Sequence, residues 1–158
     1  MRLLVVEDDQ LLNNTLCYNL AAAGYIMDTA TTKAAATAFY EAQNYDLIVL
    51  DVNLPDGNGF DLCKEIKERR PDTAVIFLTA NDMENDMLKG FELGADDYVT
   101  KPFPISVFLK KVSALLNSNA AYRHYGNGRN GAMRLLCSQI SQGNPRGKRY
   151  FHNLICLM

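Results

Sequence analysis

Four carboxylates directly follow two short apolar runs of the chain: Glu7, Asp8, Asp9 and Asp51. The runs are Leu3–Val6 and Leu47–Leu50, and their branched apolar residues are typical of buried strands. The second run is followed by Pro55 and Gly57, which favour a loop. Because the carboxyl ends of parallel strands meet at one edge of a sheet, we expect the four carboxylates to lie close together there.

A cluster of carboxylates supports a particular kind of chemistry. Like charges at short distance repel, so a buried group of them needs a cation or shifted pKa values. Mg²⁺ prefers carboxylate, water and phosphate oxygens, and a carboxylate can be the nucleophile of a phosphoryl transfer. Asp51 is the candidate nucleophile. A second interpretation, in which Asp51 only caps the following turn, stays open on this residue alone.

Two further strand-like runs end in groups that suit a phosphoryl group. Ala74–Thr79 ends in a hydroxyl, and Asp97–Thr100 leads into Lys101. A hydroxyl and an ammonium group can both donate to phosphoryl oxygens. Taken singly, Thr79 is a strand-end threonine, Lys101 a surface-loop lysine and Tyr98 a half-buried aromatic residue. Their convergence at one edge favours a site.

Strand-like and helix-like stretches alternate five times. The expected strands cover Leu3–Val6, Tyr25–Ala30, Leu47–Leu50, Ala74–Thr79 and Asp97–Thr100. The expected helices cover Leu11–Leu20, Lys33–Ala42, Phe60–Arg69, Asp82–Phe91 and Ile105–Leu116. Gly24 is placed to close the first of them. The alternation predicts an α/β fold with a doubly wound, five-stranded parallel sheet and helices on both faces.

Four motifs follow one another at compatible spacing: Leu3–Asp9, Asp51 with Leu54–Gly59, Leu78–Ala80 and Gly94–Phe103. Together they closely resemble a bacterial response-regulator receiver domain, and most of all the receivers of winged-helix transcriptional regulators. The resemblance covers about residues 1–118, which we expect to form the receiver domain. It implies a flavodoxin-like fold with the strand order 2-1-3-4-5.

The resemblance also implies roles for the residues that would handle a phosphoryl group. Asp51 matches the phosphoacceptor. Thr79 and Lys101 match the residues that bind the phosphoryl oxygens. Tyr98 matches the aromatic residue that turns inward when the threonine moves.

A Mg²⁺ site is implied by the same resemblance. Glu7 and Asp8 match the acidic pair at the metal, with Asp8 the better direct ligand. Asp51 would be a further ligand, and Asn53 would supply its backbone carbonyl. Asp9 lies one place beyond the family's pair and is interpreted as a helix cap.

The dimerisation face known for such receivers is only partly matched. Glu92, Asp97 and Lys111 agree with its charge pairs. Met87 and Val107 stand where a basic and an acidic residue are expected, so both partners of one pair are apolar. We hypothesise that a hydrophobic contact replaces this ion pair in a homodimer, since exposed ion pairs contribute little net stability. The alternative is that the face does not dimerise and Val107 packs internally.

Composition indicates a globular protein without a membrane span. The 158 residues are 48% hydrophobic and 22% charged. No apolar run approaches the roughly 20 residues of a membrane helix, and the beginning of the chain lacks the layout of a signal peptide. The four cysteines form no C-x-x-C pair, which favours free thiols in a reducing cytoplasm.

Charge divides the chain into two parts. Residues 1–119 hold all 18 acidic residues and carry a net charge of −8, whereas residues 120–158 carry +6. We expect residues 119–158 to be a basic tail, flexible or a remnant of a longer regulator, without a recognisable effector domain. Within it, Leu135–Ile140 is interpreted as one short helical segment and Tyr150–Met158 as a short apolar end. Cys137, His152 and Cys156 are disfavoured as a zinc site because a fourth ligand is missing.

The leading functional hypothesis is a phosphoacceptor switch of a two-component system that regulates transcription. A sensor histidine kinase would be its partner, and DNA would be contacted only through an effector domain not evident in this chain. The alternative is a stand-alone receiver that acts by protein contact or phosphorelay. A metal-dependent phosphatase is disfavoured, because such enzymes often carry a second Asp where Asn53 stands and Asn cannot be a general acid. We therefore expect no enzyme beyond self-catalysed phosphorylation and dephosphorylation.

Overall fold

The computed structural model describes residues 1–80 and 94–126 of the chain. Residues Met1–Asn119 form one compact unit. A second unit, Ala120–Met158, is described only as far as Gly126. The expected domain boundary after residue 118 stays a prediction. The expected helix Asp82–Phe91 and the features expected beyond Gly126 lie outside the described residues, including the disfavoured zinc ligands.

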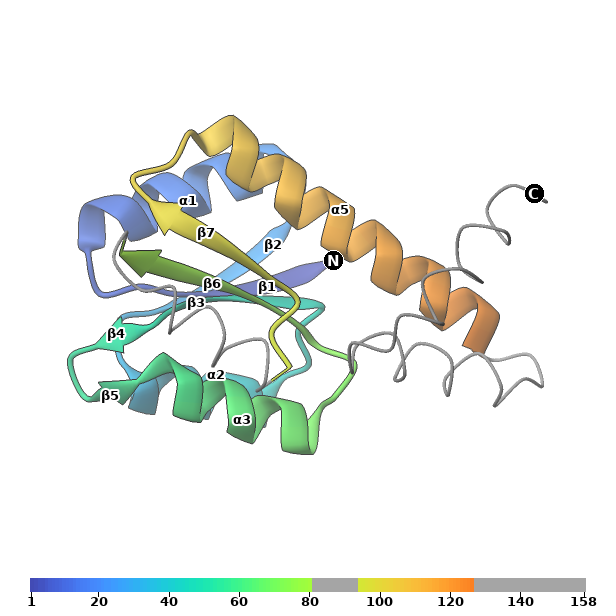
Figure 1. Ribbon diagram of the computed structural model, residues 1–158, viewed down its shortest axis with the longest axis horizontal. Helices are drawn as coiled ribbons and strands as arrows, with labels where there is room; N and C mark the ends of the chain where they lie inside the picture. The colour runs from blue at the N-terminus through green and yellow to red at the C-terminus, as the bar shows by residue number, and fades with distance from the viewer. Residues whose placement is uncertain (81–93, 127–158) are drawn as a thin grey trace, which may run out of the picture. The chain divides into compact units, whose positions relative to one another are not determined.

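A five-stranded parallel sheet forms the centre of the first unit (Figure 1). Its strands are β1 (Arg2–Val6), β2 (Ile26–Ala30), β3 (Leu47–Asp51), β6 (Ala74–Ala80) and β7 (Asp97–Lys101). Their limits agree with the expected strands to within one residue. The inner strands β1, β3 and β6 consist mainly of branched apolar or aromatic residues, which suits a sheet that is covered on both sides.

The sheet has the order β2-β1-β3-β6-β7. These labels differ from the expected order 2-1-3-4-5, because an unexpected hairpin carries the labels β4 and β5 and shifts the labels of the strands after it. The hairpin consists of β4 (Asn53–Leu54) and β5 (Gly57–Asn58), in a segment where the sequence predicted only a loop. When only the five strands of the large sheet are numbered along the chain, their order in the sheet is 2-1-3-4-5.

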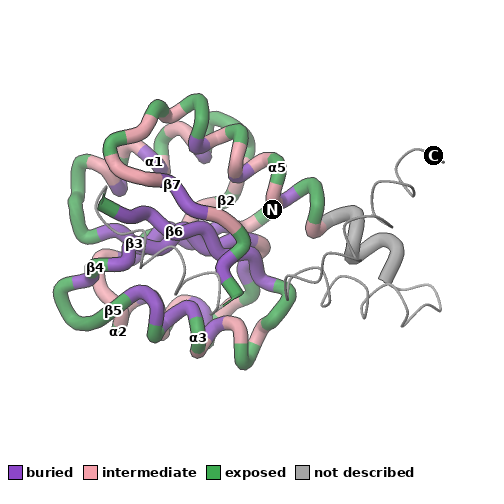
Figure 2. Tube along the Cα trace, in the orientation of Figure 1, coloured by how far each residue is buried: buried purple, intermediate pink, exposed green. Residues whose placement is uncertain are grey.

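The helices cover both faces of the sheet, as Figure 1 shows. They are α1 (Gln10–Ala22), α2 (Lys33–Ala42), α3 (Gly59–Arg69) and α5 (Ile105–Gly126). One buried cluster joins α1 and α5 to the sheet, and the other joins α2 and α3 to its opposite face. Successive strand residues alternate between the clusters: Leu3 and Val5 pack under α1 and α5, whereas Leu4 and Val6 face the other side. The inner strands β1, β3 and β6 are almost wholly buried (Figure 2), whereas most residues of the edge strand β2 are exposed or partly exposed.

The ends of α1 follow the sequence signals. The Asp9 carboxylate accepts hydrogen bonds from the amides of Leu11 at 2.9 Å and Leu12 at 3.1 Å, which confirms Asp9 as a helix cap. At the other end Gly24 has φ +89°, and its amide donates to Ala21 O at 2.9 Å. A glycine in this left-handed conformation closes the helix as expected.

The last helix is longer than expected. The apolar pattern ends at Leu116, where the sequence predicted the helix to end, but α5 continues to Gly126. The intervening residues are mostly Asn, Ser and Ala and include no Pro or Gly before Gly126. A polar segment without a breaker extends a helix that is already nucleated. None of the helices in the described ranges combines the length and apolar character of a membrane span.

Candidate functional site

The strand register brings the expected site residues to one edge of the sheet. Glu7 follows β1, and Asp51 ends β3 opposite Leu78 of β6. Thr79 is the next residue of β6, and Lys101 ends β7 opposite Ala80. The four side chains therefore come from four parallel strands at their carboxyl ends, the position where open α/β sheets bind ligands.

Three carboxylates meet at this edge. Glu7, Asp8 and Asp51 each offer an oxygen, and these oxygens lie within 4.8 Å of one another. Glu7 is 1% exposed and Asp51 is 5% exposed, whereas Asp8 is open to solvent. Two buried carboxylates beside an accessible third make a site that a hard cation can reach and bind.

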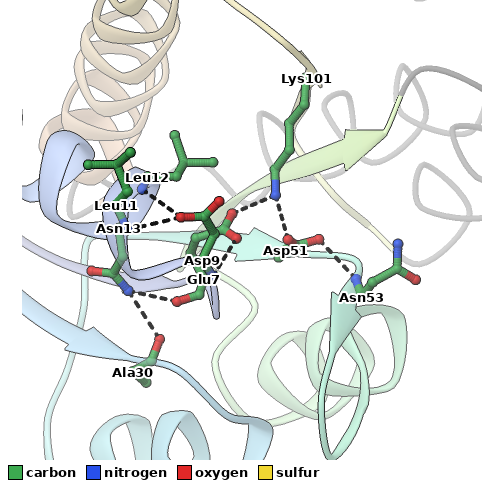
Figure 3. Close-up of polar contacts among 9 residues, drawn as sticks. All are labelled: Glu7, Asp9, Leu11, Leu12, Asn13, Ala30, Asp51, Asn53 and Lys101. Atoms are coloured by element: carbon green, nitrogen blue, oxygen red, sulfur yellow. Dashed lines mark hydrogen bonds and ion pairs between the residues drawn. The ribbon is translucent and has the colours of Figure 1, made fainter.

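Lys101 places its ammonium between the two buried carboxylates. Its Nζ lies 2.6 Å from Asp51 Oδ2 and 2.7 Å from Glu7 Oε2 (Figure 3). Burial lowers the pKa of Lys101, but the close contacts with the carboxylates of Asp51 and Glu7 and their charges outweigh that effect and raise it above its ordinary value. The amine therefore stays protonated at neutral pH and partly balances the acidic cluster. The Lys101–Pro102 peptide bond that follows is cis.

The Glu7 carboxyl group is buried beside other charged groups. Its Oε1 accepts a hydrogen bond from the Asp9 amide at 3.2 Å. Its buried Oε2 lacks a hydrogen bond of good geometry, although it lies close to Lys101. Burial raises the pKa of Glu7 to about 7, with Asp51 adding to the increase and Lys101 opposing it. A buried carboxylate oxygen without a full set of donors fits a site for a cation.

The segment after Asp51 turns tightly around the carboxylate. Asp51 Oδ1 accepts a hydrogen bond from the Asn53 amide at 2.9 Å, and the Gly59 amide donates to Val52 O at 2.8 Å. A Cβ atom at Gly59 would overlap the carbonyl oxygen of Asp51. A glycine is therefore required where α3 begins, because the strand and the helix approach one another too closely for a side chain.

Thr79 and Tyr98 lie in the interior beside the acidic edge. Thr79 is 3% exposed, and its hydroxyl donates to Ala80 O at 2.8 Å. Tyr98 is 7% exposed and its ring stacks on Phe77 with the centroids 5.8 Å apart. The simpler interpretation of Tyr98 as a half-buried residue is therefore wrong.

The expected dimerisation face is only partly described. Asp97 and Lys111 pair within the chain, with Lys111 Nζ 2.7 and 2.8 Å from the two carboxylate oxygens. Val107 is 44% exposed, so the prediction that it packs internally is wrong, whereas the absence of dimerisation stays a prediction. Met87 and Glu92 lie outside the described residues.

One contact near the site was not anticipated from the sequence. The Asp56 carboxylate accepts hydrogen bonds from the amides of Lys33 at 2.6 Å and Ala34 at 2.8 Å. The Pro55-Asp56-Gly57 sequence indicates a turn, and Asp is common in turns for local reasons. Nothing in the local sequence shows that the side chain instead caps a helix that begins 23 residues earlier.

Comparison with known proteins places this arrangement in a family. Residues 3–113 match the response regulator receiver domain. The chain is 39% identical over 119 residues to the transcriptional regulatory protein PmrA of Pectobacterium parmentieri, covering 75% of this chain and 54% of the relative. It is 41% identical over 122 residues to the regulatory protein VanRB of Enterococcus faecalis, covering 77% and 54%. The chain thus spans about half the length of these curated relatives.

Solved structures agree. The non-phosphorylated HemR receiver domain of Leptospira biflexa is 41% identical, with a TM-score of 0.69 over 73% of this chain and 93% of that one. The BeF3-activated DrrB receiver domain is 38% identical, with a TM-score of 0.67 over 73% and 97%. The chain therefore belongs to the receiver domains of two-component response regulators, and its relatives include transcriptional regulatory proteins such as PmrA.

Proposed function

We propose that this chain is a phosphorylation-controlled switch in which Asp51 takes a phosphoryl group from a phosphohistidine of a sensor histidine kinase. One observation carries the proposal: the oxygens of Glu7, Asp8 and Asp51 lie within 4.8 Å of one another, and Lys101 Nζ lies 2.6 Å from Asp51. This combination supplies a nucleophile, ligands for a cation and a positive charge for the phosphoryl oxygens.

The residues present fit Mg²⁺. Asp8, Asp51 and the backbone carbonyl of Asn53 would be the ligands, with Glu7 close by as a second acid. The chemistry of the donors supports this, since all are oxygens and one of them, on Glu7, is buried without a well-formed hydrogen bond. When bound, Mg²⁺ supplies positive charge that neutralises the oxygens of the transferring phosphoryl group.

In the proposed transfer, an oxygen of the Asp51 carboxylate attacks phosphorus and forms a new O–P bond. The P–N bond to the kinase imidazole breaks and its electron pair stays on nitrogen, so a phosphohistidine whose other ring nitrogen is protonated leaves as the neutral imidazole. Lys101, which now pairs with Asp51 Oδ2, would move its hydrogen bond to a phosphoryl oxygen. Thr79 would give up its bond to Ala80 O to donate to another oxygen.

The change at Thr79 is proposed to reach Tyr98. The two residues lie on neighbouring strands whose register pairs Phe77 with Tyr98 and Thr79 with Thr100. The Tyr98 ring stacks on Phe77, so a shift of the threonine would alter the packing on this side of the sheet. This is the expected route from the phosphorylation site to the surface of β7 and α5.

The proposed output is regulation of transcription as a homodimer. The relatives are transcriptional regulators of about twice the matched length, which supports DNA contact through an effector domain outside the receiver. The dimer would use the face formed by the helix expected over residues 82–91, which lie outside the described residues, by β7 and by α5, where Val107 is exposed. A stand-alone receiver that acts by protein contact remains the alternative, and mobility-shift assays with promoter DNA distinguish the two.

Mass spectrometry of the intact protein tests the proposal. The chain is incubated with phosphoramidate and Mg²⁺, and we expect the mass to increase by one phosphoryl group. The increase should be absent with EDTA and in Asp51→Asn. Asp61→Asn, which alters an exposed carboxylate at the start of α3, is the matched control and should be modified like the wild type. An unmodified wild type, or a modified Asp51→Asn, would refute the proposal.

A further inference from the structure

The turn of the β4–β5 hairpin is tied to the start of α2. Asp56 lies in this turn, and its two carboxylate oxygens accept from the amides of Lys33 and Ala34 at 2.6 and 2.8 Å. These are the first two residues of α2, whose amides have no partner within the helix. The third amide, of Ala35, donates to the Thr32 hydroxyl at 3.1 Å. Asp56 and Thr32 thus cap the same helix, one from a distant segment and one locally.

The hairpin also packs on the side chain of Lys33. A Cβ atom at Gly57 would lie 3.0 Å from Lys33 Cδ, so the hairpin backbone rests directly on the lysine stem. The Lys33 ammonium lies 3.0 Å from Glu65 Oε1 on α3, which holds that stem in place. The tip of the hairpin is therefore held by the Asp56 carboxylate, which bonds to α2, and by the Gly57 backbone, which packs on Lys33.

The other end of the hairpin lies at the phosphorylation site proposed above. Asn53 begins β4, and its amide donates to Asp51 Oδ1 at 2.9 Å. Only two residue pairs, Asn53 with Asn58 and Leu54 with Gly57, separate this amide from the turn that holds Asp56. A displacement of the turn would therefore reach Asn53 through only two residue pairs.

We propose that Asp56 is a positioning residue: by capping α2 it anchors the β4–β5 hairpin and so holds the Asn53 backbone in place for Asp51 and for the divalent cation. The part that concerns the cation rests on the proposed function. The contact is well suited to this role, because a carboxylate at a helix N-terminus is favoured by the helix dipole and forms charge-assisted hydrogen bonds. The amides of Ala34 and Lys33 also hold the pKa of Asp56 below its ordinary value, so the carboxylate is charged at neutral pH.

Two cap variants of α2 separate positioning from simple loss of helix stability. Asp56→Ala removes the cap that joins the hairpin to α2, whereas Thr32→Ala removes the local cap and leaves the hairpin contact. In metal-free protein, amide hydrogen exchange of Asn53 is measured by NMR for both variants and for the wild type. Mg²⁺ affinity is measured separately by calorimetry. Asp56→Asn, which keeps one acceptor oxygen, is the milder second variant should Asp56→Ala fold poorly.

We expect Asn53 to exchange about tenfold faster in Asp56→Ala, since the hairpin opens locally, and Mg²⁺ to bind about tenfold more weakly, as for other residues that orient metal ligands. Asp56→Asn should lie between it and the wild type, and Thr32→Ala should match the wild type in both measurements. Unchanged exchange at Asn53 in Asp56→Ala and Asp56→Asn, or equal effects of Thr32→Ala, would overturn the proposal. If the wild type binds no Mg²⁺, the proposed function fails, while the exchange measurement still decides the role of Asp56.

Discussion

A single ammonium group offsets two buried carboxylates at the centre of this site. Lys101 Nζ lies 2.7 Å or less from oxygens of both Glu7 and Asp51. Burial of an unpaired carboxylate is costly, so the positive charge of Lys101 stabilises both carboxylates. During phosphoryl transfer the same amine would serve the phosphoryl oxygens. Lys101 therefore has two roles that substitution can separate.

Replacing Lys101 by Met should separate metal binding from phosphorylation. Without the ammonium the carboxylates attract a cation more strongly, so Mg²⁺ should bind at least as tightly as in the wild type. The phosphorylation rate should fall about 100-fold, because a donor to the transferring group is lost. Calorimetry with Mg²⁺ and the rate of mass increase with phosphoramidate give the two values. Lys110→Met, on the exposed side of α5, is the control; weakened Mg²⁺ binding or an unchanged rate in Lys101→Met would contradict this account.

Tyr45 lies at the opposite end of the sheet. Because its pKa is raised, we expect the free energy of unfolding to fall at alkaline pH. Burial, then the hydrogen bond to Asp28 at 2.9 Å, raises this pKa from 10 to about 12. Above the unfolded value the unfolded chain loses the phenolic proton while the folded protein keeps it. The contribution of Tyr45 is therefore complete below pH 10 and falls by about 2 kcal/mol as the pH rises to 12.

Tyr45→Phe should remove this component of the pH dependence. At neutral pH the variant should be less stable by about 1 kcal/mol, because the hydrogen bond to Asp28 is lost. The difference from the wild type should shrink as the pH rises above 10 and reverse sign by pH 12, where the variant should be the more stable protein by about 1 kcal/mol. Urea unfolding across this range measures it, with Tyr18→Phe at an exposed position as the control. A difference that stays constant with pH would show that Tyr45 titrates normally.

At the scale of elements, the close approach of β3 to α3 leaves no room for a methyl group at Gly59. In Gly59→Ala the new Cβ would overlap the Asp51 carbonyl oxygen, so the strand end and the helix must move apart. We expect a loss of about 1–3 kcal/mol in unfolding free energy, typical of overpacking, together with slower phosphorylation of Asp51.

Gly24→Ala is the matched control for that substitution. Gly24 has φ +89°, but a methyl group added there would have no atom within 4 Å, so the variant should lose about 1 kcal/mol through backbone strain alone. Its phosphorylation rate should equal that of the wild type. Denaturant unfolding and the phosphoramidate rate are compared for both variants, and equal rates in Gly59→Ala and the wild type would contradict the prediction.

The elements were predictable to the extent that local signals define them. Apolar runs located all five strands, and Asp9 and Gly24 marked the ends of α1 because capping and left-handed conformations depend on one residue. The end of α5 was missed because the apolar pattern stops at Leu116 while the helix needs no further burial to continue. The hairpin after Asp51 was missed because strands of two residues carry no periodicity.

The site was predictable from the order of the strands, whereas its supporting contacts were not. Once the carboxyl ends of parallel strands share an edge, Asp51 and Lys101 must approach each other although 50 residues separate them. The Asp56 contact to α2 depends instead on how a loop folds over a helix. Likewise, Lys67 lies 2.7 Å from Asp96 across 29 residues. Such contacts depend on three-dimensional packing that no local pattern records.

At the scale of the whole molecule, the exposed side chain of Val107 is the expected contact between two copies of the chain in the proposed dimer. If a hydrophobic contact replaces an ion pair in the proposed dimer, an acid at this position should oppose dimerisation. We expect Val107→Glu to weaken the phosphorylation-dependent dimer about tenfold, as the desolvation of an unpaired carboxylate would. Sedimentation velocity measures this, and Ile26→Glu at another exposed apolar position is the control. Equal dimerisation of Val107→Glu and the wild type would refute the hydrophobic contact.

The central claim is that Asp51 itself carries the phosphoryl group. An acyl phosphate is reduced by borohydride to an alcohol, so a phosphorylated Asp51 becomes homoserine and can be located by peptide mass spectrometry. We predict homoserine at position 51 after treatment with phosphoramidate and Mg²⁺, none there when Mg²⁺ is chelated, and none at Glu7 or Asp8. Homoserine at another acidic residue, or unreduced Asp51 in protein whose mass had increased, would contradict the account.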